Sequence, residues 1–167
     1  MTTQTPSAPS PLIRRLRRAA PVLALAVVLL AAGLRLHLLG AQSLWNDEGS
    51  SYVQATRTFS AIADNAARDI HPPGYYWMLA AWRALTGESE FALRALSAFA
   101  SIMTVALTYA IGRRLMNPWA GVFAAALVAL NTFAIYYAQE ARMYALLALW
   151  AAGAVCALIG LLEACTP

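Results

Sequence analysis

Four long apolar runs constrain this chain more than any other feature of its sequence. They cover residues 19–39, 91–112, 119–137 and 142–162 and consist largely of Ala, Leu and Val. At a helical rise of about 1.5 Å per residue, each run would be roughly 30 Å long, the thickness of the hydrocarbon core of a bilayer. Since 60% of the whole chain is apolar and only 12% is charged, we predict an all-α polytopic membrane protein with about four transmembrane helices.

Residues 1–18 precede the first run and differ from it in composition. They are rich in Pro, Ser and Thr and end in a basic cluster, Arg14, Arg15, Arg17 and Arg18. We predict a disordered basic leader on the cytoplasmic side, because basic residues beside the first span usually face the cytoplasm. A cleaved signal peptide would show a similar order of segments. The length of the first run and the three runs after it favour an uncleaved helix.

The segment 42–89 is the most polar part of the chain and is predicted to form an outer loop with two juxtamembrane helices. In the first of these, apolar residues recur at helical spacing, as in a helix that lies on a membrane surface: Tyr52, Ala55, Phe59, Ile62 and Ala66. The second helix is predicted to begin after Pro72-Pro73-Gly74 and to end near Gly87. Ser89 is predicted to cap the second spanning helix.

The acidic residues gather on one side of this topology. The loop 42–89 and the turn 139–142 would share the outer face, and every acidic residue except Glu163 lies on or near it. The formal charge is +4, but the arginines flank apolar runs and form no basic face with interleaved aromatic residues. This arrangement argues against nucleic acid as a partner. The outer face is therefore where we expect the chemistry.

Two adjacent carboxylates, Asp47 and Glu48, follow Trp45-Asn46 just beyond the first span. One interpretation is structural, with Asn46 capping a helix whose first turn holds both carboxylates and meets the positive end of the helix dipole. A carboxylate at the membrane boundary can also act as a general base or as a ligand of a divalent metal. The two interpretations are compatible.

A second polar motif, His71-Pro72-Pro73-Gly74-Tyr75, lies in the middle of the outer loop. The paired prolines fix the backbone and can simply start a helix. They would also present His71 and Tyr75 to a binding site. A single histidine without a second ligand argues only weakly for metal.

The third polar motif surrounds the predicted junction of the last two spans. Glu140 and Arg142 are two residues apart there, and Tyr144 follows. Interfacial Tyr and Arg commonly anchor a span, but the planar fork of a guanidinium also suits phosphate. Arg35 and Arg94, each about one turn inside the outer end of a span, are further phosphate-binding candidates, and either can instead extend its charge to the membrane surface.

The order of these motifs resembles the N-terminal part of a known group of membrane enzymes. Trp45-Asn46-Asp47-Glu48, His71-Pro72-Pro73, Ser89-Glu90-Phe91-Ala92-Leu93-Arg94 and Gln139-Glu140-Ala141-Arg142-Met143-Tyr144 occur in the same order in the polyprenyl-phosphate-sugar-dependent glycosyltransferases. These are GT-C enzymes related to protein O-mannosyltransferases and lipid A aminoarabinose transferases, often called glycosyltransferase family 39. The resemblance covers residues 12–163, so we expect 19–167 to be the N-terminal part of a GT-C transmembrane domain. Members usually have many more spans, and the chain resembles the front third of such an enzyme.

The resemblance implies an inverting sugar transfer on the outer face of the plasma (inner) membrane, from a polyprenyl-phosphate-linked donor to a hydroxyl acceptor. It implies a catalytic Asp at the start of the first outer loop, matched here by Asp47 with Glu48 as its acidic neighbour, and we predict these two carboxylates as the catalytic residues. We predict that the substrate-binding residues are Arg35, His71, Tyr75, Arg94, Glu140, Arg142 and Tyr144. The sugar, the acceptor and any need for a divalent metal stay open.

Two other classes of function are compatible with the sequence. One is a non-catalytic or truncated membrane protein that binds a lipid or protein partner. The other is part of a transporter, which the position of the charges at helix ends rather than in mid-span disfavours.

Overall fold

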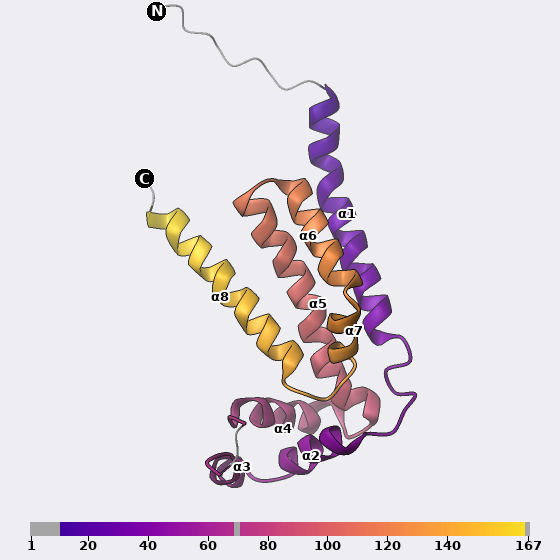
Figure 1. Cartoon of the computed structure of the whole chain (residues 1–167), viewed down its shortest axis with the longest axis vertical. Helices are drawn as coiled ribbons and strands as arrows, with labels where there is room; N and C mark the ends of the chain where they lie inside the picture. The colour runs from indigo at the N-terminus through magenta and orange to yellow at the C-terminus, as the bar shows by residue number, and fades with distance from the viewer. Residues whose placement is uncertain (1–10, 69–70, 166–167) are drawn as a thin grey trace, which may run out of the picture.

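The computed structural model describes residues 11–68 and 71–165, and every regular element within them is an α-helix. In Figure 1 the long helices lie side by side, and short helices gather at one end of them. The elements are α1 Pro11–Leu36, α2 Asn46–Ala55, α3 Phe59–Ala66, α4 Gly74–Thr86, α5 Glu90–Leu115, α6 Pro118–Leu130, α7 Thr132–Ala138 and α8 Tyr144–Cys165. The predicted all-α polytopic fold is confirmed.

The N-terminal leader differs from the prediction. Residues 1–10 lie outside the described residues, but 11–18, which we expected to be disordered, form the beginning of α1. Pro11 occupies the first helical position, where its missing N–H costs nothing, and Leu and Arg are good helix formers. The helix therefore begins well before the apolar run.

Three helices are long and apolar enough to cross a membrane, namely α1 over Ala19–Leu36, α5 and α8. The third predicted run is not one straight helix, because α6 and α7 meet at an angle of 61° and make a fourth span only as a bent pair. Asn131 causes the break: its backbone leaves the helical region (φ −66°, ψ 115°), and its Oδ1 accepts the N–H of Ala134, 2.9 Å away. The predicted span 119–137 therefore contains a helix cap at Asn131.

Helix α5 is the centre of the bundle and contacts α1, α6, α7 and α8. It packs tightly against α6, where Gly112 faces Gly121. A Cβ on Gly112 would lie 2.8 Å from the Cα of Gly121, and a Cβ on Gly121 would lie 2.6 Å from the backbone oxygen of Tyr109. Small residues therefore set the spacing of this helix pair, as is common between membrane helices.

The three short helices lie beside the turn between α7 and α8, at the end of the bundle opposite the start of α1 and the end of α8 (Figure 1). We call this end, with α2, α3, α4 and the turn 139–143, the polar end. Two helices were predicted in the loop; the structure has three, because the first is split by Thr58, whose side chain accepts the N–H of Ala61. The other predicted helix is confirmed as α4, as is the cap of α5 by Ser89.

A buried apolar cluster joins the short helices to the spans. Ile62 of α3 and Leu79 of α4 are fully buried in it, together with Leu93 of α5 and Leu146 of α8. Burying side chains of this size contributes about 1.5–3 kcal/mol each. The polar end is therefore part of the folded core and holds its own side chains in fixed positions.

Candidate active site

Glu48 is fully buried at the centre of the polar end. Its Oε1 accepts from Nε of Arg94 at 2.8 Å and its Oε2 from Nη2 of the same side chain at 2.6 Å. The backbone N–H of Ala141 donates to Oε1 at 2.8 Å, and that of Trp45 to Oε2 at 3.3 Å. Burial by itself would raise the pKa of Glu48, but these hydrogen bonds outweigh it and hold the pKa below its ordinary value. One carboxylate thus connects α2, α5 and the turn 139–143.

Arg94 uses all five of its N–H donors inside the protein. Besides the two bonds to Glu48, Nη1 donates to the carbonyls of Leu39 and Gln42 at 3.0 and 2.8 Å, and Nη2 donates to that of Ser43 at 3.1 Å. A guanidinium has five N–H groups, so none remains for another acceptor. Arg94 holds the chain between α1 and α2 in place, and we do not include it in the substrate site.

Arg35 is also fully buried and bonded to protein groups. Its Nε donates to Oγ of Ser101 at 2.8 Å, and its Nη atoms donate to the carbonyls of Val128 and Ala129, both at 3.1 Å. The break at Asn131 leaves these carbonyls at the C-terminus of α6 without partners in the next turn. A cation there satisfies them and meets the negative end of the helix dipole.

The turn between α7 and α8 is fixed from both sides. The side-chain amide of Gln139 donates to carbonyls at the end of α1, those of Leu34, Arg35 and His37, at 3.2, 3.4 and 3.0 Å. The hydroxyl of Ser97 donates to the carbonyl of Arg142 at 3.1 Å. Sequence reasoning did not assign Gln139 or Ser97 a role, because both act through contacts distant in sequence.

Asp47 differs from its neighbour in keeping its carboxylate accessible. Its side chain is 45% exposed, and its Oδ2 lies 3.6 Å from Nη2 of Arg142, whose side chain is only 9% exposed. Nη1 of Arg142 also donates to the backbone carbonyl of Asp47 at 3.3 Å. Both carboxylates lie in the first turn of α2 as predicted, but the cap position belongs to Trp45 and not to Asn46, so α2 begins one residue earlier than expected.

Two tyrosines lie close to Arg142. The guanidinium carbon is 5.8 Å from the centre of the Tyr144 ring. Burial lowers the pKa of Arg142, but a hydrogen bond with Tyr144 and the charge of Asp47 raise it above the ordinary value. Tyr75 is buried in α4 with a hydroxyl that has no hydrogen-bond partner among the described residues. Burial raises the pKa of Tyr75, and the charge of Arg142 opposes this shift.

Glu140 lies near Arg142 in sequence but faces another part of the protein. It is buried at the edge of a cavity of about 710 Å³ that it shares with Tyr136, Gln139 and Trp45. Burial raises the pKa of Glu140, although a hydrogen bond with Tyr136 works against that shift. His71 lies in the turn before α4 and is partly buried. The substrate-binding roles of Glu140 and His71 stay predictions.

The arrangement gives the two adjacent carboxylates different directions. Glu48 points inward to Arg94, and Asp47 points toward Arg142, so the two do not converge on one point. Within 11–68 and 71–165, there is no group of three or more His, Cys, Asp or Glu side chains that could hold a metal ion. What the site does offer is an accessible carboxylate beside a guanidinium.

Comparison with known proteins identifies one family. A family model described as dolichyl-phosphate-mannose-protein mannosyltransferase matches residues 70–165, which include Tyr75, Arg94, Glu140, Arg142 and Tyr144. The match begins after Asp47 and Glu48. Neither the curated proteins nor the solved structures gave a significant match to the chain.

Proposed function

Since the chain belongs to the dolichyl-phosphate-mannose-protein mannosyltransferase family, we propose that it transfers a sugar from a polyprenyl-phosphate-linked donor to a hydroxyl acceptor. The observation that carries this proposal is the pairing of Asp47 with Arg142. An accessible carboxylate and a guanidinium fork face each other at 3.6 Å, at one end of a membrane-spanning bundle. Such a pair offers a proton acceptor and a phosphate-binding group side by side.

In this proposal Asp47 is the general base. The acceptor hydroxyl gives its proton to the carboxylate while its oxygen forms a bond to the anomeric carbon of the sugar. The bond between that carbon and the phosphate oxygen breaks on the opposite face, so the configuration inverts. Placing both reactants beside the base supplies much of the rate, because a bound pair no longer has to meet by diffusion.

Arg142 would bind the phosphate of the donor and stabilise the charge that develops as polyprenyl phosphate leaves. Its rigid support favours this role: the backbone carbonyl accepts from Ser97, and Asp47 lies against its fork. The unpartnered hydroxyl of Tyr75 is a further donor for a sugar or phosphate oxygen. A buried polar group without a partner costs about 1–3 kcal/mol, which a bound substrate would recover.

Glu48 and Arg94 have a different role in the proposal. Their side chains are buried and bonded to each other, so they position Asp47 and the turn 139–143 and do not touch the reacting atoms. Glu48 was predicted to be catalytic together with Asp47; we now propose it as a positioning residue.

We place the polar end outside the cytoplasm, at the plasma (inner) membrane. The support for this orientation is the cluster of arginines in the first part of α1, at the opposite end of the bundle. Basic residues beside the first span favour the cytoplasmic side. A donor carried by a lipid would then reach the site within the membrane, without a soluble nucleotide sugar.

The substitution Asp47→Asn tests the base. Membranes containing the complete gene product would be given radiolabelled polyprenyl-phosphate sugars, and transfer to endogenous acceptors would be measured. Asn removes proton acceptance but keeps the shape of the side chain, so we expect transfer to fall about 10²–10⁴-fold. The lost helix-dipole interaction, only about 0.3–1 kcal/mol, would change the stability little.

Two outcomes would contradict the proposal. A variant Asp47→Asn that folds normally and transfers sugar at a near wild-type rate would exclude Asp47 as the base. A wild-type protein that binds the donor but transfers nothing would favour the alternative function, a membrane protein that binds lipid without catalysis.

A further inference from the structure

The cavity of about 710 Å³ beside Glu140 is separate from the Asp47–Arg142 site. It lies between the C-terminal end of α1, the chain 37–45 that follows α1, and α7. Neither Asp47 nor Arg142 is part of its lining. We call it the α1–α7 cavity.

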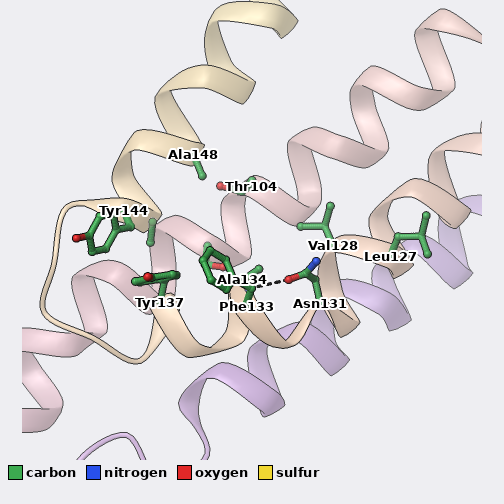
Figure 2. A pocket seen from close by; sticks show the side chains of 11 residues that line it. Thr104, Leu127, Val128, Asn131, Phe133, Ala134, Tyr137, Tyr144 and Ala148 are labelled. Carbon is green, nitrogen blue, oxygen red and sulfur yellow. Dashed lines mark hydrogen bonds between the residues drawn. The ribbon is translucent and has the colours of Figure 1, made fainter.

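Helix α7 separates this cavity from an apolar pocket among the spans. Figure 2 shows Phe133 and Tyr137 of α7 at that pocket, which has a volume of about 570 Å³. Ile135 lines the α1–α7 cavity instead. Residues two positions apart in a helix point about 200° apart, so Ile135 faces away from both rings. Of the two cavities, the α1–α7 cavity is the one with acidic and basic side chains in its lining.

Most polar groups at the α1–α7 cavity already have protein partners. Arg94 and Glu48 are bonded to each other, with Nη2 of the arginine 2.6 Å from Oε2 of the glutamate. The side-chain amide of Gln139 donates to three carbonyls at the end of α1. These groups therefore need no ligand. Glu140 differs from them.

The carboxylate of Glu140 is buried but has few partners. The residue is only 6% exposed, and the hydroxyl of Tyr136 donates a hydrogen bond to its carboxylate. An ionised carboxylate can accept about four hydrogen bonds. Tyr136 supplies one of them, so about three positions stay open for donors from the cavity.

The charges around Glu140 do not balance within the protein. Three carboxylates, those of Asp47, Glu48 and Glu140, lie near two guanidiniums, those of Arg94 and Arg142. Each guanidinium forms its salt bridge with one of the other two carboxylates, and Glu140 forms none within 11–68 and 71–165. An ionised carboxylate that is buried without a cation is unfavourable. A positively charged ligand would therefore be stabilised at Glu140.

An ammonium group meets these requirements. A primary ammonium carries one positive charge and three N–H donors, which matches the open positions on Glu140. The rings of Trp45 and Tyr136 line the same cavity, and aromatic faces attract cations. A divalent metal would need several oxygen ligands. The described residues contain no group of three His, Cys, Asp or Glu side chains that could supply them.

We propose that the α1–α7 cavity binds a primary ammonium group at Glu140. The inference goes beyond the proposed sugar transfer and does not depend on it, because Asp47 and Arg142 lie outside the cavity. Leu34 and Ile135, near the ends of two spans, are also part of the lining. The ammonium can therefore belong to a lipid headgroup or to a soluble amine, and the experiment distinguishes these two sources.

Native mass spectrometry of the full chain in a non-ionic detergent tests the proposal. The probes are phosphatidylethanolamine and N-acetyl-phosphatidylethanolamine, which has the same acyl chains and phosphate but no ammonium. We expect the wild type to bind phosphatidylethanolamine at least about tenfold more tightly. Glu140→Gln should abolish this preference. Asp64→Asn, which removes an exposed carboxylate of α3, should keep it.

A pair of tryptophan variants tests the location without changing a charge. Ala41 is exposed and lines the cavity, so Ala41→Trp would fill it. Ala67, directly after α3, is exposed and is not part of the lining. We expect Ala41→Trp to lower the affinity for phosphatidylethanolamine about tenfold and Ala67→Trp to leave it unchanged. Circular dichroism of each variant would verify that it is folded.

Ethanolamine distinguishes the source of the ammonium. A ligand that binds only the folded protein raises its apparent Tm. If the ligand is a soluble amine, ethanolamine should raise the Tm of the wild type but not that of Glu140→Gln. If it is a lipid, ethanolamine should have no effect, while the preference for phosphatidylethanolamine is present.

Either of these two patterns would support the proposal. Equal affinity for the two lipids, together with no effect of ethanolamine, would overturn it by showing that Glu140 binds no ammonium. A preference for phosphatidylethanolamine that survives both Glu140→Gln and Ala41→Trp would overturn it too, because the ammonium would then bind elsewhere.

Discussion

Asp47 and Glu48 are neighbours in the first turn of α2, yet Glu48 is fully buried against Arg94 while Asp47 keeps 45% of its side chain exposed beside Arg142. Consecutive residues of a helix point about 100° apart, so one turn can send one carboxylate into the core and the other to the surface. The pair therefore separates two tasks, one of holding the polar end together and one of meeting substrate.

Replacing Arg142 by Lys should impair use of the donor more than it lowers the amount of folded protein. Lysine keeps the charge but loses the fork, and one lost charged hydrogen bond costs about 1.5–3 kcal/mol, or roughly 10–100-fold in the KM for the donor. Transfer assays at several donor concentrations would measure this. Arg57→Lys, at an exposed position, is the control, and an equal response of both variants would assign Arg142 to membrane anchoring.

Replacing Glu48 by Gln should destabilise the protein. The change leaves Arg94 buried with its charge unpaired, and removing one partner of a buried ion pair costs about 3–5 kcal/mol. Thermal unfolding in detergent, followed by circular dichroism, would show a lower apparent Tm. A second variant that also carries Arg94→Met should recover part of the loss, because the unpaired charge is then gone. No difference between the single and double variants would indicate that the two side chains are not coupled.

The stability should respond to pH in opposite ways at Glu48 and Glu140. The pKa of Glu48 lies below the ordinary value of 4.5. The stability that ionised Glu48 adds to the folded protein is therefore lost as the pH falls from about 4.5 through that pKa. The pKa of Glu140 is raised, mainly by burial, so its ionised form opposes folding above about 4.5. We therefore expect Glu140→Gln to raise the apparent Tm at neutral pH, with the gain vanishing near pH 4.5. A gain that persists in acid would have another cause.

The orientation in the membrane can be tested with single cysteines. In a background with Cys156 and Cys165 replaced by Ser, Asn65→Cys in α3 should react with an impermeant thiol reagent added to intact cells. Met116→Cys, which lies in the turn at the other end of the bundle and is 76% exposed in the native protein, should react only after permeabilisation. The reverse pattern would place the polar end in the cytoplasm.

The close contact of α5 with α6 predicts the effect of adding one methyl group. Gly121→Ala would bring a Cβ to 2.6 Å from a backbone oxygen, so the helices would have to separate. Such overpacking costs about 1–3 kcal/mol, visible as a lower apparent Tm. Gly153→Ala in α8 meets nothing within 4 Å and should be neutral or stabilising by up to about 1 kcal/mol. Equal effects of the two substitutions would contradict the contact.

The sequence predicted most of what depends on local pattern. The spans follow from uninterrupted apolar runs, and Ser89 and Gly87 mark helix ends through their own chemistry. The split between α6 and α7 was missed because the apolar run continues through it, although Asn131-Thr132 carried the signal of a cap. The partners of Arg35 and Arg94 could not be predicted, since Arg94 reaches back 46 residues to Glu48 and Arg35 reaches forward 66 to Ser101. Both were predicted as phosphate-binding candidates that could instead extend their charge to the membrane surface.

The hydrogen bond from Ala141 to Glu48 joins residues 93 positions apart. The ribosome therefore releases Glu48 long before it makes Ala141, and α5, α6 and α7 must all enter the bilayer in between. Until the turn after α7 emerges, Glu48 has only its earlier partners, and the Asp47–Arg142 pair does not yet exist. The site consequently cannot form before the turn 139–143 has been made, so a nascent chain stalled before residue 141 carries the arginine that neutralises Glu48 but no means of binding phosphate at Arg142.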